Sequence, residues 1–276
     1  MTWHAALALD YTLESDRSVA RFVHDGPLRV LQTLYPEGDA VCHNVLVHPP
    51  GGLVGGDTLD IRVNVGGGAH ALVTTPGATR FYRSEGELAL QRTQLRLQAG
   101  ARMEWLPLES ILYNGCRGEN RLSFELDPGA ELLAWDITAL GLPHADQPFA
   151  RGSFCQHIEM SGVWLERGVI DAGDARLLNS PLGLAGQHCM ASIFFAAGSA
   201  MTRERRESAL DCARQRLQAH PLGTMAGATS PNPQLLVLRA LAPQVEPALD
   251  LLKSVWAAWR QCLWDLPAQQ PRIWAM

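Results

Sequence analysis

Three Gly-Ala pairs recur in the middle of the chain, at residues 68–69, 100–101 and 129–130, at intervals of 32 and 29 residues. Each pair follows a segment in which apolar and polar residues alternate, such as residues 59–65, and precedes another apolar run. Alternation with a period of two is typical of a strand with one buried face. Repetition of such strand–turn–strand units predicts a β-solenoid-like stack of short strands. Ordinary hairpins in a β-sandwich would give the same local pattern, so that alternative stays open.

The last third of the chain has a helical period instead. Residues 246–264 carry apolar side chains at alternating steps of four and three, which gives one apolar face. A second stripe covers residues 202–219, with Thr202 as its N-cap residue. A short strand is expected at residues 235–238, between the two helices. We therefore predict a mainly β fold with two α-helices in the C-terminal third.

The same pattern predicts the domain organisation. Residues 1–276 should form a single domain, in which residues 1–200 are the β-stack and residues 201–276 are a helix–strand–helix extension packed on it. Trp256 and Trp259 lie on the apolar face of the last helix. They could anchor a partner if one of them faces outward, and the alternative is that they pack on the protein's own sheet.

Composition excludes several classes of protein. The chain has 276 residues, of which 47% are hydrophobic and 18% charged, and its net charge is −5, which argues against nucleic-acid binding. No stretch reaches the roughly 18 apolar residues of a membrane span. Residues 1–10 lack the basic region and the apolar run of a signal peptide. We expect a cytoplasmic protein with no nucleic-acid or membrane partner and with reduced cysteines.

A glycine-rich corner and a polar loop form the most specific local pattern. The corner runs from His48 to Asp57, with four glycines and two prolines, and the loop covers residues 74–84. Glycine permits close backbone approach, so the corner is either a shaped binding site or simply a turn. It is not a phosphate loop, because Asp57 stands where that motif needs a lysine.

Motifs for catalysis or tight metal binding are scarce. The chain has no GxSxG, HExxH or CxxC sequence, so we assign no catalytic residue and predict that the protein is not an enzyme. Three Cys/His pairs could bind a metal, at residues 42–43, 155–157 and 188–189. Adjacent residues of a strand point to opposite faces, however, so a buried thiol beside a hydrogen-bonded histidine is the alternative.

Several separate blocks, in the same order, resemble the signature of the urease accessory protein UreD family, also called UreH. They include His48–Asp57, Thr74–Ser84 and Glu104–Glu109, and further matches lie at residues 26–28, 35–39 and 271–274. Two loops depart from the family pattern: Tyr113-Asn-Gly-Cys116 replaces Phe-Asp-Gly-Ala, and Leu140-Gly-Leu-Pro143 replaces Leu-Gly-Arg-Pro. The matching blocks mark His48, Tyr82, Arg83 and Glu109 as partner-binding or structural residues. Trp256 and Trp259 join these candidates because they lie on the apolar face of the last helix.

This resemblance implies a non-catalytic urease maturation factor with a mostly β, helical-stack fold. It would assemble with UreF and UreG on apo-urease and help deliver nickel, with no tightly bound cofactor and only transient nickel. A stand-alone β-solenoid enzyme acting on carbohydrates and a pure scaffold without metal transfer are the alternatives.

The resemblance also implies an internal nickel route lined by Asp57, Thr79 and Glu166. Asp57 could instead cap its glycine turn, and Glu166, next to Arg167, could be a surface charge.

Overall fold

The repeated Gly-Ala pairs occupy stacked corners of the chain. Gly68, Gly100 and Gly129 have φ angles of 75°, 72° and 80°, a conformation that favours glycine. A Cβ on Gly100 or Gly129 would lie 3.8 or 3.7 Å from the backbone nitrogen of the glycine one turn earlier. The alanine after each glycine is fully buried. The computed structural model, which describes residues 2–275, therefore places the repeats in register as successive turns of one stack.

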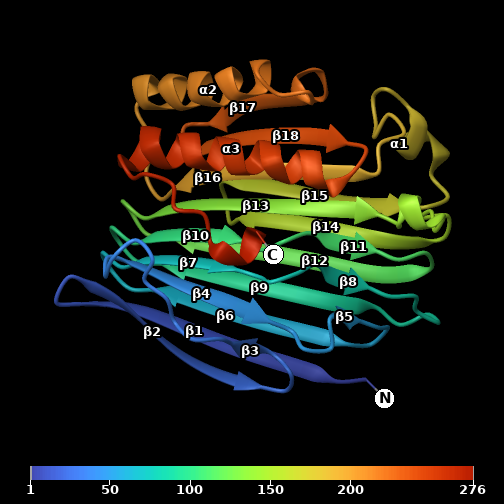
Figure 1. The fold of residues 1–276 in the computed structure, drawn as a ribbon, viewed down its shortest axis with the longest axis horizontal. Coiled ribbons are helices and arrows are strands. Elements are labelled where there is room, and N and C mark those ends of the chain that lie inside the picture. The colour runs from blue at the N-terminus through green and yellow to red at the C-terminus, as the bar shows by residue number, and fades with distance from the viewer. Residues whose placement is uncertain (1, 276) are drawn as a thin grey trace.

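The first wall of the stack is a seven-stranded sheet (Figure 1). Its central neighbours are parallel, and each comes from a different turn. In spatial order the strands are β15 (Trp164–Asp171), β14 (Gly152–Met160), β12 (Cys116–Leu126), β9 (Ala89–Leu97), β6 (Thr58–Val65), β1 (His4–Glu14) and β2 (Arg17–Asp25).

The second wall belongs to an eleven-stranded sheet, again with parallel neighbours at its centre. Its main path is β17 (Ala226–Asn232), β18 (Leu235–Ala242), β16 (Cys189–Ala197), β13 (Glu131–Leu140), β10 (Arg102–Leu106), β7 (His70–Thr74), β4 (Val41–Val47) and β3 (Arg29–Val30). Three short strands join at one side: β5 (Gly52–Leu53), β8 (Thr79–Phe81) and β11 (Ser110–Leu112).

Parallel pairing of consecutive turns distinguishes the two folds that the repeat allowed. Hairpins would pair antiparallel, whereas β6, β9, β12 and β14 are parallel neighbours. The predicted β-solenoid-like stack is confirmed, with about four turns. Antiparallel strands occur at the two ends of the stack.

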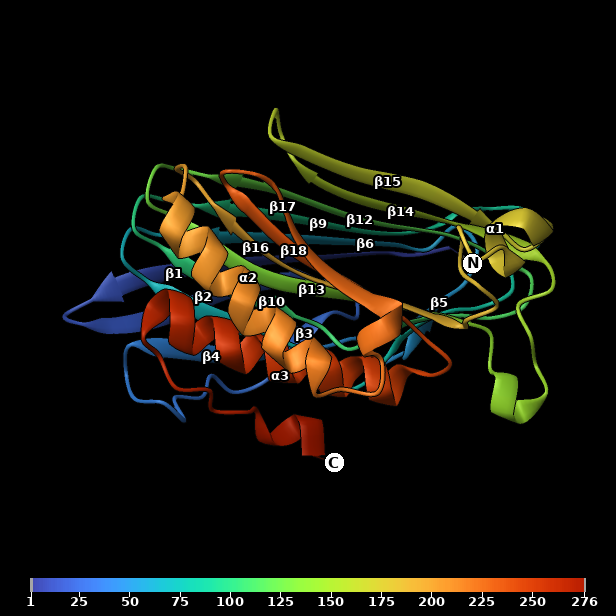
Figure 2. The same ribbon diagram turned by 90° about the horizontal axis from the view of Figure 1, so that it is seen from above.

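Strand alternation divides the apolar residues between two cores. On β13, Leu132 and Ala134 face the interior between the two sheets, whereas Leu133 and Trp135 face outward toward the helices. The first core fills the solenoid, and the second lies between the eleven-stranded sheet and a helical layer (Figure 2). The same sheet therefore contributes one face to each core.

Both C-terminal helices lie where the sequence predicts them. They are α2 (Arg203–Gln218), capped by the Thr202 side chain, and α3 (Val245–Trp264). A short helix, α1 (Ala175–Asn179), was not predicted; it is only five residues long, and Asp174 caps it. The 3-10 turns are η1 (Pro143–Ala145), η2 (Gly223–Met225) and η3 (Arg272–Ala275). Strand β17 was also missed, because its Pro231 weakens the strand pattern and is tolerated at a sheet edge.

A tryptophan on α3 can anchor a partner only if its side chain is exposed, and the structure shows that neither candidate is. Trp256 and Trp259 are both 0% exposed, and the indole N–H of Trp259 donates to the carbonyl of Ala209 on α2 at 2.9 Å. The alternative is confirmed: this face of α3 packs on α2 and on the protein's own sheet. Within residues 2–275, no helix is long and apolar enough to cross a membrane.

Candidate functional site

Two columns of polar side chains lie on the inner faces of the two sheets, where most neighbours are apolar, and the second column reaches solvent at Arg239. On the seven-stranded sheet, Asn120 of β12 pairs in register with Gln91 of β9 and Gln156 of β14. On the eleven-stranded sheet, Asp136 of β13 pairs with Ser192 of β16, which pairs with Arg239 of β18. Stacking in register therefore aligns polar groups from distant parts of the sequence into two continuous rows.

Hydrogen bonds connect the two columns. The Gln91 amide donates to the Asn120 carbonyl oxygen at 3.2 Å, and the Asn120 amide donates to an Asp136 carboxylate oxygen at 3.0 Å. The Thr138 hydroxyl also faces the other Asp136 oxygen, at 3.4 Å. A polar path thus crosses from one sheet to the other in the interior.

Three neighbouring cavities follow this path. The first, of about 210 Å³, is lined by His48 and Thr79 among others, and shares Thr79 and Gln91 with a narrow second cavity of about 20 Å³. That second cavity shares Asp136 with a third, of about 550 Å³, which Glu166 also lines. The series runs along the stack from the glycine corner to the end formed by β15 and β18.

The third cavity contains groups that lack protein partners. Gln156 is only 8% exposed, and within residues 2–275 neither atom of its amide forms a hydrogen bond. Burial raises the pKa of Asp136 from its ordinary value of 3.8 to about 6, although nearby Gln156, Thr138 and Asn120 act to lower it. An unsatisfied buried amide beside a carboxylate whose pKa is raised by burial is the environment expected of a polar ligand or of water.

Two of the three residues implied as route ligands line this cavity series. Thr79 lies on β8 at the first and second cavities, and Glu166 lies on β15 at the third. Glu166 is partly exposed, and both of its carboxylate oxygens contact Arg239 rather than a neighbour in sequence. Its role as a route ligand stays a prediction.

Asp57 has the contacts of a turn cap. Its two carboxylate oxygens accept the backbone N–H groups of Trp3, at 3.3 Å, and Val54, at 3.0 Å. It is 1% exposed and lines none of the three cavities described above. The geometry favours capping of the glycine corner, and a part in metal transfer stays a prediction.

His48 stands at the first cavity. Its ring packs against Trp3 at 5.0 Å, and its buried Nε2 has no hydrogen-bond partner within residues 2–275. Burial lowers the pKa of His48, and the Asp57 carboxylate opposes this shift. The resulting neutral imidazole has a lone pair that a polar guest could use.

The other signature residues support the walls. Tyr82 packs against Tyr113 at 4.9 Å, and the backbone carbonyl of Glu109 accepts the N–H of Thr79 at 2.9 Å. Arg83 is exposed and pairs with Cys116 through an isolated β-bridge. A partner-binding role for these three residues stays a prediction.

The adjacent residues Cys42 and His43 lie on opposite faces of β4, as strand geometry predicts, whereas Cys155 and His157, two residues apart on β14, share a face. Cys42 lies in the solenoid core, while His43 points the other way and lies 2.7 Å from Glu37. Cys189 lies in the second core, and burial raises its pKa to about 12. Across residues 2–275, no three His, Cys, Asp or Glu side chains gather as they would around a metal ion.

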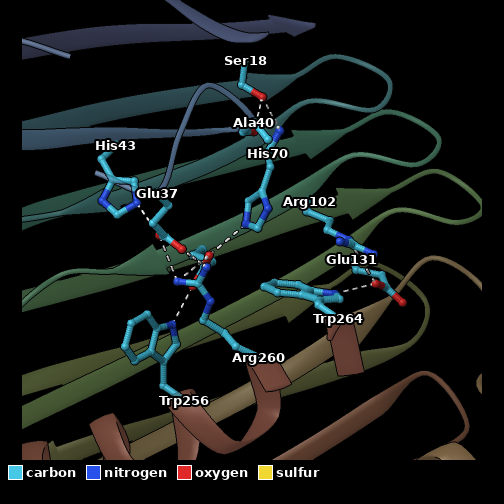
Figure 3. A network of polar contacts seen from close by, with 11 residues as sticks. Ser18, Glu37, Ala40, His43, His70, Arg102, Glu131, Trp256, Arg260 and Trp264 are labelled. Atoms are coloured by element: carbon cyan, nitrogen blue, oxygen red, sulfur yellow. Dashed lines mark hydrogen bonds and ion pairs between the residues drawn. The ribbon is translucent and has the colours of Figure 1, made fainter. Parts of the chain in front are cut away.

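A second polar cluster lies under α3, outside the solenoid (Figure 3). Arg260, which is 0% exposed, contacts Glu37 with two guanidinium nitrogens and approaches Glu104 at 3.8 Å. Glu104 also accepts from Trp256 and lies 2.8 Å from His70. The Arg260 guanidinium lies between the two carboxylates, in the place that a metal cation would need. Because Arg260 is on α3 and Glu104 is on β10, the cluster holds the helix to the sheet.

A signal for the interior columns was present in the sequence. In β12, Gly118, Asn120, Leu122 and Phe124 share the buried face, so Asn120 is a polar residue at an apolar position of the alternation. Gln156 is in the same situation in β14. Counting polar residues on the buried parity of each repeat would have indicated both, and Asp136 by its place in the next turn.

The fold and this site define a β-solenoid protein with rows of polar side chains and neighbouring cavities between its sheets. Comparison with known families is specific: the model described as UreD urease accessory protein matches residues 4–275, so the chain belongs to the UreD family. It is 75% identical to the urease accessory protein UreD of Albidiferax ferrireducens over 276 residues, covering all of both chains. The UreD proteins of Polaromonas naphthalenivorans and Leptothrix cholodnii are 67% and 52% identical, with 100% and 99% of each chain covered. The chain thus has a role in urease maturation, as an accessory factor.

Proposed function

We propose that this protein assembles with UreF and UreG on apo-urease in the cytoplasm and provides an internal route by which Ni²⁺ reaches the urease active site. In this proposal nickel is cargo, and the protein is neither an enzyme nor the holder of a resident cofactor. Membership of the UreD family supports the role in maturation.

The observation that supports a route, rather than a scaffold alone, is the series of cavities along the two polar columns. An apolar core gains nothing from Gln91, Asn120 and Gln156 in register, because buried amides cost free energy unless they are paired. A hydrated cation passing through would use their oxygen atoms. A polar species that moves along the columns would therefore account for these buried amides.

The donor set suits transit. Ni²⁺ accepts oxygen and imidazole ligands, and the path offers His48, Thr79, Asp136 and Glu166 at separate points. Sites of one or two donors bind weakly, so an ion can leave each of them as well as enter. A thiolate cage would hold the metal, but burial raises the pKa of Cys42, and it raises the pKa values of Cys116 and Cys189 to about 12.

Blocking the polar link between the sheets tests the route. Asn120→Leu replaces the amide that joins Gln91 to Asp136 by an apolar group of similar size. We expect complexes with UreF, UreG and apo-urease to assemble normally, while the urease recovered contains several-fold less nickel and less activity. The matched control is Asn64→Leu, on the outer face of β6, where the side chain is exposed and bonds Asp10.

Glu166→Ala and Asp57→Ala extend the test to the two carboxylates. Glu166→Ala should lower nickel loading with the complex intact, whereas Asp57→Ala should act first through the stability of the corner. Normal nickel loading by Asn120→Leu and Glu166→Ala, in assembled complexes, would leave the pure scaffold as the better proposal. Turnover of a substrate by the chain alone would favour the stand-alone enzyme.

A further inference from the structure

An ion pair that joins the two sheets lines the third cavity, at the far end of the series. Arg239 on β18 contacts both carboxylate oxygens of Glu166 on β15, with Nε at 3.3 and 3.2 Å and a closer contact through Nη2. The two strands belong to different sheets, and both residues line the third cavity. The side chains are 48% and 33% exposed, so the pair stands where the interior meets solvent.

The third cavity, which this pair lines, has mostly apolar walls with a few oxygen-bearing side chains, and Arg239 is the positive group among the residues that line it. Asp136 and the unpaired amide of Gln156 line the same cavity, and Gln156 is only 8% exposed. Burial raises the pKa of Asp136, and the charge of Glu166 raises it further, so the carboxylates act on each other. Two carboxylates and an amide oxygen on the walls of one cavity are a hard donor set of the kind that divalent cations accept.

We propose that Arg239 is a positioning residue that keeps this donor set from retaining the cation: its guanidinium competes with the metal for Glu166 and so makes the last site of the passage a site of release. This inference rests on the proposed nickel route. A divalent ion arriving from Asp136 must displace the guanidinium to reach Glu166, and the guanidinium returns as the ion leaves. The result is a weak site at the point where the ion must be given up.

Nickel affinity provides the direct test. Equilibrium dialysis of the full-length chain with NiCl₂ alone should show at least tenfold tighter binding for Arg239→Gln than for the unchanged protein, because two carboxylates then face the ion without a competitor. The double variant Arg239→Gln/Glu166→Gln should lose that gain. Arg239→Lys, which keeps the charge but not the bidentate geometry, should give an intermediate affinity. The control is Arg203→Gln, which breaks an exposed pair with Glu207 on α2.

Delivery should change in the opposite direction from affinity. In complexes with the urease subunits, Arg239→Gln should retain nickel and load urease several-fold more slowly, and Arg239→Lys should restore part of the rate. A purely structural role for Arg239 would lower stability without tightening nickel binding. Circular dichroism melting of each variant shows whether it is folded, and if Arg239→Gln is not, the folded Arg239→Lys variant decides through its nickel affinity.

The two proposals fail in different ways. The release role of Arg239 is wrong, and the route survives, if Arg239→Gln binds nickel no more tightly than the unchanged chain while Asn120→Leu still lowers nickel loading. Where Arg239→Gln is unfolded, the nickel affinity of Arg239→Lys takes its place in this comparison. If Asn120→Leu and Glu166→Ala both load urease normally, the route is wrong and the release role falls with it.

Discussion

Asp136 is a carboxylate whose interior position opposes its ionisation. Its pKa in the folded protein is raised to about 6, above the ordinary 3.8, because burial favours the protonated form. The free energy of unfolding therefore includes the full contribution of this group only below about pH 4, and that contribution is lost as the pH rises through 6. Asp136→Asn should therefore raise the free energy of unfolding at pH 8 by about 2–3 kcal/mol. Urea denaturation at pH 5 and pH 8 measures this, and the gain should be clearly smaller at pH 5. An equal gain at both pH values would contradict the assigned cause.

Asp57 should matter through backbone hydrogen bonds. Asp57→Ala leaves the partly buried N–H groups of Trp3 and Val54 without their acceptor, which costs about 1 kcal/mol for each hydrogen bond. Asp57→Asn keeps one acceptor oxygen and should lose less. Thermal melting of the two variants should rank Ala below Asn, and an Ala variant as stable as the unchanged protein would exclude the capping role.

Helix α3 depends on the buried cluster at its inner face. Arg260→Met removes the guanidinium between Glu37 and Glu104 and should destabilise the fold by about 3–5 kcal/mol, because the carboxylates stay buried without it. Arg203→Met on α2, which breaks an exposed pair, should leave the melting temperature unchanged. Adding Glu37→Gln to Arg260→Met should recover part of the loss; no recovery would show that packing, rather than charge, dominates.

Trp259 should likewise act through packing. Trp259→Ala removes a fully buried ring and the hydrogen bond to Ala209 that joins α3 to α2, at an expected cost of about 3–5 kcal/mol. The change should appear as a lower unfolding midpoint in urea. Selective loss of binding to UreF by a variant of unchanged stability would instead restore the partner-anchor hypothesis.

At the scale of the whole molecule, the eleven-stranded sheet joins the solenoid core to the helical layer. Because the two cores share its strands, we predict that the chain unfolds as the single domain proposed from the sequence. Circular dichroism and tryptophan fluorescence should give one coincident transition in urea. Two separated transitions would mean that residues 201–276 form an independent unit.

The sequence by itself determined the local elements and the faces they bury. The Gly-Ala repeat predicted the stacked turns, since glycine favours the positive φ that each corner adopts. The apolar stripes predicted α2 and α3, because a period of 3.6 residues places those side chains on one face. Thr79 and Glu166 came from resemblance to a family, and the structure places both at the cavities.

Only the tertiary structure decided which residues meet. Glu166 pairs with Arg239, 73 residues away, and Glu37 with Arg260, 223 residues away. Strand alternation assigns a side chain to a face, but its neighbour on the next strand depends on register, which loop lengths and the packing of the entire stack set together. For the same reason the sequence could mark Asn120 and Gln156 as polar residues at buried positions, but it could not show that they align with Gln91. That alignment exists only once consecutive turns have stacked.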